Sequence, residues 1–87
     1  MPNNRAPASP VLDSVVLHRI EPKVGAWRFY IVMLERNLFG HICVARSWGR
    51  VGTRGRAMSE PYESEAEATV EMRKLVVTKL KRGYAVL

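Results

Sequence analysis

Every strand-like segment of this 87-residue chain precedes its one helix-like segment, and this order is the strongest constraint on the fold. Four stretches have the composition or the alternation of β-strands: residues 14–21, 26–36, 41–48 and 56–62. No helix lies between them, so βαβ crossovers and a parallel sheet are excluded. We therefore expect an α+β fold: a single antiparallel β-sheet of about four or more strands, with one helix from the C-terminal half packed on one face.

The stretch 26–36 differs from the other strands because both of its faces are apolar. Period two places Trp27, Phe29, Ile31 and Met33 on one side and Arg28, Tyr30, Val32 and Leu34 on the other. A strand of this kind is typical of the centre of a sheet. The fourth stretch is short, and we expect Pro61 to end it.

The helix has clear start and stop signals. Ser64 can act as the N-cap, Glu67 completes a capping box, and Gly83 follows the last helical turn at about Arg82. An apolar arc should bury against the sheet, and its members are Ala68, Met72, Leu75, Val76 and Leu80. We also expect the methionines at 33, 58 and 72 to fill the core.

The chain is long enough for one domain, which we place at residues 13–87 after a disordered N-terminal tail at 1–12. The single cysteine, Cys43, excludes an intrachain disulfide and is expected to be a buried apolar residue. No segment resembles a signal peptide or a membrane span, so the predicted location is the cytoplasm.

The charge is strongly positive and unevenly distributed. Fourteen Lys and Arg residues oppose eight Asp and Glu residues, giving a net charge of +6. No carboxylate occurs between Glu35 and Glu60, although that interval holds five arginines: Arg36, Arg46, Arg50, Arg54 and Arg56. A second basic group lies near the C-terminus and consists of Lys79, Lys81 and Arg82. If the fold brings the two groups together, they form a surface suited to phosphate.

A glycine-rich stretch, SWGRVGTRGR at residues 47–56, places a tryptophan among arginines. It lacks the Gly-Lys-Ser/Thr ending of a P-loop and the βαβ context of a dinucleotide fingerprint. Two interpretations remain open from these residues alone. The stretch is either a tight hairpin in which Trp48 closes the edge of the core, or a loop that presents Trp48 and its arginines to a ligand.

The residues Trp48-Gly49-Arg50-Val51-Gly52, followed by Gly55, resemble the signature of the WGR domain. The aromatic strand before the motif and the capped helix with a terminal Gly-Tyr after it also resemble that family, so the likeness covers residues 14–84. WGR domains occur in DNA-dependent poly(ADP-ribose) polymerases and as small separate bacterial proteins, and this chain is similar to the second kind.

This resemblance implies a nucleic-acid-binding module, with DNA as the expected partner, RNA as an alternative, and a location at the bacterial nucleoid. Trp48 matches the residue that packs on a sugar near a strand end, Arg50 matches the motif arginine, and Gly49 shapes the turn. Tyr84 matches an aromatic that can line the same surface, although a core role fits it equally. The complete predicted nucleic-acid-binding set is Arg46, Trp48, Gly49, Arg50, Arg54, Arg56, Lys79, Lys81 and Tyr84.

A protein-interaction adaptor that uses Trp48 and Arg50 as anchors is the alternative function. An enzyme is not expected, because His18 and His41 lie in strand-like stretches with no catalytic constellation around them. We expect no catalytic residue, cofactor, metal site or membrane partner. The sequence leaves open the oligomeric state, sequence specificity, and any preference for ends or nicks.

Overall fold

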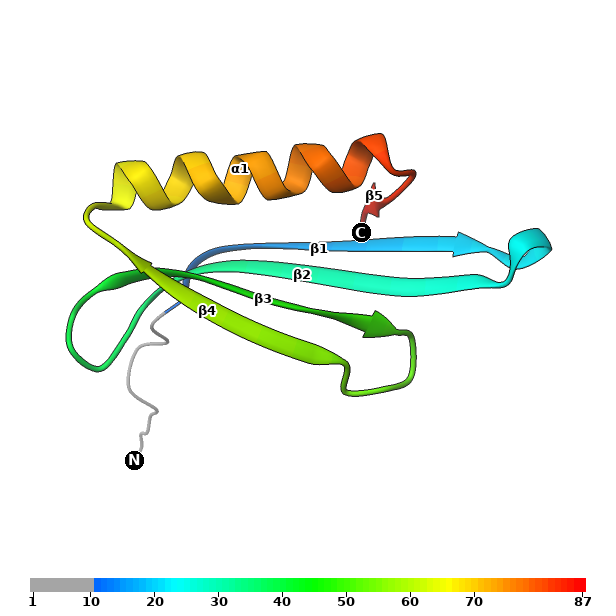
Figure 1. Ribbon diagram of the computed structural model, residues 1–87, viewed down its shortest axis with the longest axis horizontal. Helices are drawn as coiled ribbons and strands as arrows, with labels where there is room; N and C mark the ends of the chain where they lie inside the picture. The colour runs from blue at the N-terminus through cyan, green and yellow to red at the C-terminus, as the bar shows by residue number, and fades with distance from the viewer. Residues whose placement is uncertain (1–10) are drawn as a thin grey trace, which may run out of the picture.

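The computed structural model describes residues 11–87 and contains a five-stranded antiparallel sheet with the strand order β4-β3-β2-β1-β5. One α-helix lies across one face of this sheet (Figure 1). The elements in chain order are β1 (Val11–Glu21), the 3-10 turn η1 (Pro22–Val24), β2 (Ala26–Arg36), β3 (Ile42–Arg50), β4 (Arg56–Tyr62), α1 (Glu65–Lys81) and β5 (Ala85–Val86). The predicted α+β class is confirmed.

The apolar strand, β2, lies at the centre of the sheet as its two apolar faces predict. The edges differ from expectation in three ways. β1 begins at Val11, so two residues assigned to the tail belong to the strand; Val11 pairs with Glu35, and a register shift separates it from Asp13, while the remainder of the predicted tail lies outside the described residues. Pro61 sits within β4, where an edge strand tolerates a missing N–H, and β5 is a short strand that no sequence pattern signalled.

The helix termini follow the predicted signals. The Ser64 hydroxyl accepts a hydrogen bond from the Glu67 N–H at 3.2 Å, and the Glu67 carboxylate accepts one from the Glu63 N–H. At the other end, the Gly83 N–H donates to the Leu80 carbonyl and the Tyr84 N–H donates to the Lys79 carbonyl. These two bonds, with Gly83 at a φ of 93°, form a Schellman motif that turns Tyr84 back toward the last turn of the helix.

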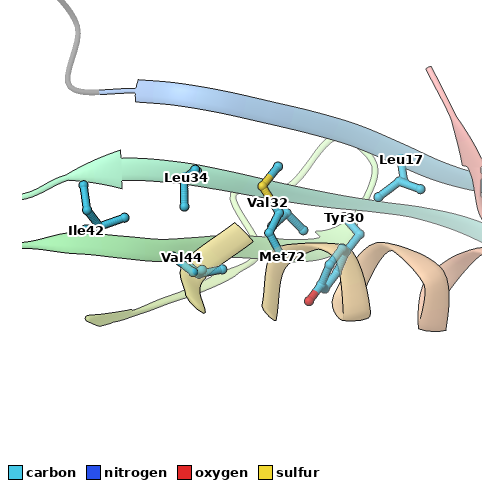
Figure 2. Packing of buried hydrophobic residues seen from close by; sticks show 8 residues of the cluster. Leu17, Tyr30, Val32, Leu34, Ile42, Val44 and Met72 are labelled. Carbon is cyan, nitrogen blue, oxygen red and sulfur yellow. The ribbon is translucent and has the colours of Figure 1, made fainter. Parts of the chain in front are cut away.

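The main buried cluster lies between the sheet and the helix. Figure 2 shows Met72 of α1 above a layer of sheet side chains, with Tyr30 extending from β2 toward the helix. The buried sheet residues of this cluster are Leu17, Tyr30, Val32, Leu34, Ile42 and Val44. Leu80 was expected to bury with the apolar arc, but it is 43% exposed, because at 100° per residue it lies about 120° around the helix from the buried Ala68, at the edge of the arc. Cys43 is free and buried, as predicted.

The opposite face of the sheet carries no element of the described chain (Figure 1). Strand alternation places on it the second apolar row of β2, including Trp27, which is 41% exposed. We call this surface the open face and define it by its apolar residues: Val16, Ile20, Trp27, Phe29, Ile31, Met33, Cys43 and Ala45. A single helix cannot cover both faces of a five-stranded sheet.

The β3–β4 hairpin depends on a close approach of its two ends. Gly55 has a φ of 72°, and a Cβ atom built there would overlap the Trp48 carbonyl and lie 2.8 Å from Cζ of Phe29. A glycine is therefore required at this position for both space and backbone conformation. Its contact brings the end of the WGR motif against the base of the hairpin.

Gly55→Ala should destabilise the domain by about 3 kcal/mol, from the left-handed backbone and the overlap together. The matched control is Gly52→Ala, where φ is also positive but nothing lies within 4 Å of the added methyl. Its cost should be about 1 kcal/mol. Urea unfolding of both variants measures the difference, and equal losses would contradict the close approach.

Candidate nucleic-acid interface

The strand register sorts the helix-covered face of the sheet into rows that differ in chemistry. At the hairpin end, Arg28 stands opposite Arg50. The next row places Tyr30 opposite Trp48, which in turn faces Arg56, and the row after it contains Arg46 opposite Met58. Cations and aromatic rings therefore alternate across neighbouring strands at one end of the sheet. The C-terminal end of α1 lies over the same end of the molecule (Figure 1).

A pocket of about 340 Å³ opens between these rows and the helix. Its aromatic and apolar walls are formed by Tyr30, Trp48, Met58 and Leu75, and its polar rim by Arg46, Thr78, Lys79 and Arg82. Within the part of the chain that the structure describes, no carboxylate lines it. We call it the WGR pocket. Its chemistry suits an anion that also carries an apolar ring.

Trp48 has both of the positions that the sequence left open, because it packs at the edge of the core and also lines a pocket. Its indole packs against the core cluster, with the ring centroid 6.3 Å from that of Tyr30. It also forms a wall of the WGR pocket. The alternation of β3 explains this position, because residue 48 falls on the same face as the buried Ile42 and Val44. The ring is half-buried and lies at the end of a strand, rather than standing free in the loop.

Arg46 is held in place by three neighbours. Its guanidinium donates to the Tyr30 hydroxyl at 3.4 Å and to the Met58 sulfur at 3.0 Å. Its Cζ atom lies 5.8 Å from the centroid of the Trp48 ring, within the range of a cation–π contact. None of these partners is an anion, so the arginine keeps its full charge for a ligand.

Lys79 reaches the pocket from the helix. Its Nζ atom lies 4.6 Å from the centroid of Tyr30 and 5.4 Å from that of Tyr84, and the two rings meet edge to face. The Schellman motif supplies this arrangement, since it folds Tyr84 against the residue whose carbonyl it caps. Tyr84 thus supports the pocket through Lys79 and packs against the core cluster.

The cations of this region have no carboxylate partners among the described residues. Ion pairs in residues 11–87 join only Arg19 to Glu21 and Lys74 to Glu71, both at the surface. The basic side chains left around the WGR pocket are Arg28, Arg46, Arg50, Arg56, Lys79 and Arg82. Like charges directly opposite each other on a sheet, as in the Arg28–Arg50 pair, are destabilising.

The pKa of Lys79 is lowered in this cluster of cations. Burial lowers it first, because a desolvated ammonium is disfavoured, and the nearby guanidinium groups of Arg82, Arg46 and Arg28 lower it further. The other end of the same helix face is acidic. There, burial and then the carboxylates of Glu60 and Glu71 raise the pKa of Tyr62. The WGR pocket is therefore the positive end of a surface that changes sign along the helix.

The structure places the remaining predicted residues in different positions. Arg50 ends β3 and Arg56 begins β4 next to the pocket, whereas Arg54 is exposed in the turn between them. Gly49 lies against Gly55 at the base of the hairpin. Lys81 is exposed, and at 100° per residue it points about 200° around the helix from Lys79, away from the pocket.

Six contributors were missed by sequence reasoning about the site: Arg28, Tyr30, Met58, Leu75, Thr78 and Arg82. Arg28 and Tyr30 share a strand face, which the alternation of residues 26–36 already indicated. Only the strand register shows that this face lies opposite Trp48 and Arg50. Met58 was expected in the core but is 40% exposed beside Arg46. Arg82 was recognised as basic, and only the helix direction shows that it joins Lys79.

In residues 11–87, no three His, Cys, Asp or Glu side chains come together as metal ligands would. Over the same range, no helix has both the length and the apolar character needed to cross a bilayer.

The fold and the pocket together define a small α+β domain with a positively charged aromatic site on one side of its sheet. The sequence matches the family model of the WGR domain over residues 13–87, and the chain belongs to that family.

Two known proteins are similar to the chain. The uncharacterized protein y4dW of Sinorhizobium fredii is 40% identical over 68 residues, which cover 78% of this chain and 33% of the relative. A crystal structure of a Bacteroides fragilis protein shares the fold with a TM-score of 0.73 and 21% identity, covering 86% of this chain and 19% of that one. The chain therefore spans about a third of the length of its curated relative.

Replacing a neighbouring cation should raise the pKa of Lys79, because each one disfavours the protonated ammonium. We expect an upward shift in both Arg46→Gln and Arg82→Gln, measured by NMR titration of the lysine side-chain carbons. Linkage gives the companion sign: folded stability should rise with pH from the lowered pKa toward 10.5, and Lys79→Met should remove that rise.

Proposed function

We propose that this WGR domain binds nucleic acid, with DNA as its expected ligand. The observation that carries the proposal is the convergence of Arg28, Arg46, Lys79 and Arg82 on an aromatic pocket with no carboxylate partner. Nucleic acid supplies both of the missing components, since phosphate matches the cations and a sugar or base matches the rings. Membership of the WGR family is consistent with this function in general.

The binding mode follows from the arrangement of the pocket. Arg46, Lys79 and Arg82 would contact phosphate oxygens, and Trp48 would pack on a sugar or an unstacked base. The exposed hairpin would extend the phosphate contacts through Arg50, Arg54 and Arg56. A half-buried indole cannot insert between stacked base pairs, so a strand end, a nick or a single-stranded segment is the substrate that fits it. The mode requires no catalytic step and no cofactor.

Binding should weaken steeply with salt, because each neutralised phosphate releases condensed counterions. The three pocket cations and the three hairpin arginines together give six phosphate contacts, and therefore a slope of log affinity against log salt of about −5.4 on duplex DNA. Arg46→Gln, Lys79→Gln and Arg82→Gln should each flatten the slope by about 0.9. Fluorescence anisotropy of a labelled oligonucleotide at several salt concentrations measures it.

Lys74→Gln is the matched control for these variants, because it removes the same charge from the far side of the helix, where Glu71 already pairs with it. Its slope should equal that of the unmodified chain. If binding is insensitive to salt and survives nuclease treatment of a captured complex, the surface serves the alternative function, an adaptor for an acidic protein.

Preference for ends tests the role of Trp48 separately. Trp48→Ala should weaken binding to nicked or linear DNA by about tenfold, while binding to closed circular duplex changes less. Phe39→Ala removes an exposed aromatic ring from the turn between β2 and β3, at the other end of the sheet, and should leave both affinities unchanged. Equal losses on ended and closed DNA would remove end recognition from the proposal without removing nucleic-acid binding.

A further inference from the structure

The open face is a large apolar surface on the side of the sheet opposite the helix. β2 contributes a row of four large side chains, Trp27, Phe29, Ile31 and Met33, and β1 adds Val16 and Ile20 beside them. Val16 and Ile20 are each 36% exposed. No element of the described chain packs on this side (Figure 1). A contiguous apolar patch of this kind indicates an interface.

The charges of the strands are segregated away from this surface. By the register, no lysine or arginine of the described strands lies on the open face, and the ionisable residues there are His18 and Glu35. The cations of the WGR pocket lie on the opposite side of the sheet. Two copies, each with a net charge of +6, can therefore meet through their open faces without bringing their basic groups together.

The side chains of the open face also differ in size from one half of the sheet to the other. The β1 and β2 half carries the large residues, whereas the β3 and β4 half carries small ones: Cys43, Ala45, Ser47, Ala57 and Ser59. A two-fold axis parallel to the strands, between β2 and β3, places the large half of each copy over the small half of the other. An axis across the strands would instead oppose the two large rows.

We propose that the open face is the interface of a homodimer, in which two copies pack sheet against sheet about a two-fold axis parallel to the strands. β2 of one copy lies over β3 of its partner, as in the aligned packing of β-sandwiches. The register then sets Ile31 of each copy over the small side chain of Ser47 in the other. The two WGR pockets face outward on opposite sides of the dimer.

The N-terminal residues are a poorer occupant than a second copy. Residues 1–10, MPNNRAPASP, contain one large apolar side chain, Met1, and cannot replace the area that a second open face offers. The second copy also explains why the small half of the surface consists of uncharged residues, since it has to receive the large half of an identical chain.

The test is sedimentation velocity of the full chain over a range of concentrations. We expect a reversible dimer. Its dissociation constant should rise by about tenfold or more in both Ile31→Lys and Ala57→Lys. Ala57 is exposed in one copy, so Ala57→Lys should fold even if Ile31→Lys does not. The control, Val77→Lys, adds the same charge to an exposed valine on the outer side of the helix and should remain dimeric.

Salt distinguishes this interface from the nucleic-acid site. Added salt should strengthen dimerisation, because it screens the repulsion between two positive chains, whereas it weakens nucleic-acid binding. In a Trp48→Phe background, emission from Trp27 should shift to shorter wavelength as the dimer forms. A monomer at every concentration would overturn the proposal, as would a dimer that persists in both Ile31→Lys and Ala57→Lys. A monomer in which deletion of residues 1–10 newly exposes Trp27 would assign the face to the N-terminal segment instead.

Discussion

The packing of one helix on one face of a five-stranded sheet is the constraint on which the rest of the structure depends. It places the whole buried cluster between α1 and the sheet and leaves an equally apolar row of β2 on the other side. It also forces every strand to present two different chemistries, one to the helix and one to the open face. The arginines of the strands lie on the helix-covered face, where the ends of β2, β3 and α1 surround the WGR pocket.

The WGR pocket depends on the turn that ends its helix and on the hairpin that follows its third strand. The Schellman motif at the end of α1 folds Tyr84 against Lys79, and Lys79 in turn lies over Tyr30 in the middle of β2. The close contact at Gly55 fixes the hairpin that follows Trp48. The side chains of the site are therefore held by a capped helix and by a hairpin with closely packed ends, rather than by a flexible loop. They are positioned before any ligand binds.

Local signals explain what was predictable from the sequence. The helix was defined at both ends by Ser64 and Gly83, whose effects operate within one turn, and the central place of β2 followed from its two apolar faces. The pocket was only half predictable because its members come from four elements, β2, β3, β4 and α1, and are brought together by the strand register and the position of the helix. Two lysines that lie close together in the sequence, Lys79 and Lys81, fall on opposite sides of the helix. β5 gave no signal because two residues are too few for a pattern.

The electrostatics of the pocket connect stability to ligand binding. Arg28 faces Arg50 across the ladder, and the pKa of Lys79 is lowered by burial and by three guanidinium groups, so the folded domain holds its cations against their mutual repulsion. A bound anion would reverse this repulsion and raise the pKa of Lys79 again, and by linkage it would stabilise the fold that binds it. The buried ring of Tyr30 and the half-buried ring of Trp48 make the arrangement tolerable without a ligand, because their faces attract the cations nearest to them. The aromatic residues thus serve the free domain as a partial substitute for the charge that a phosphate would supply.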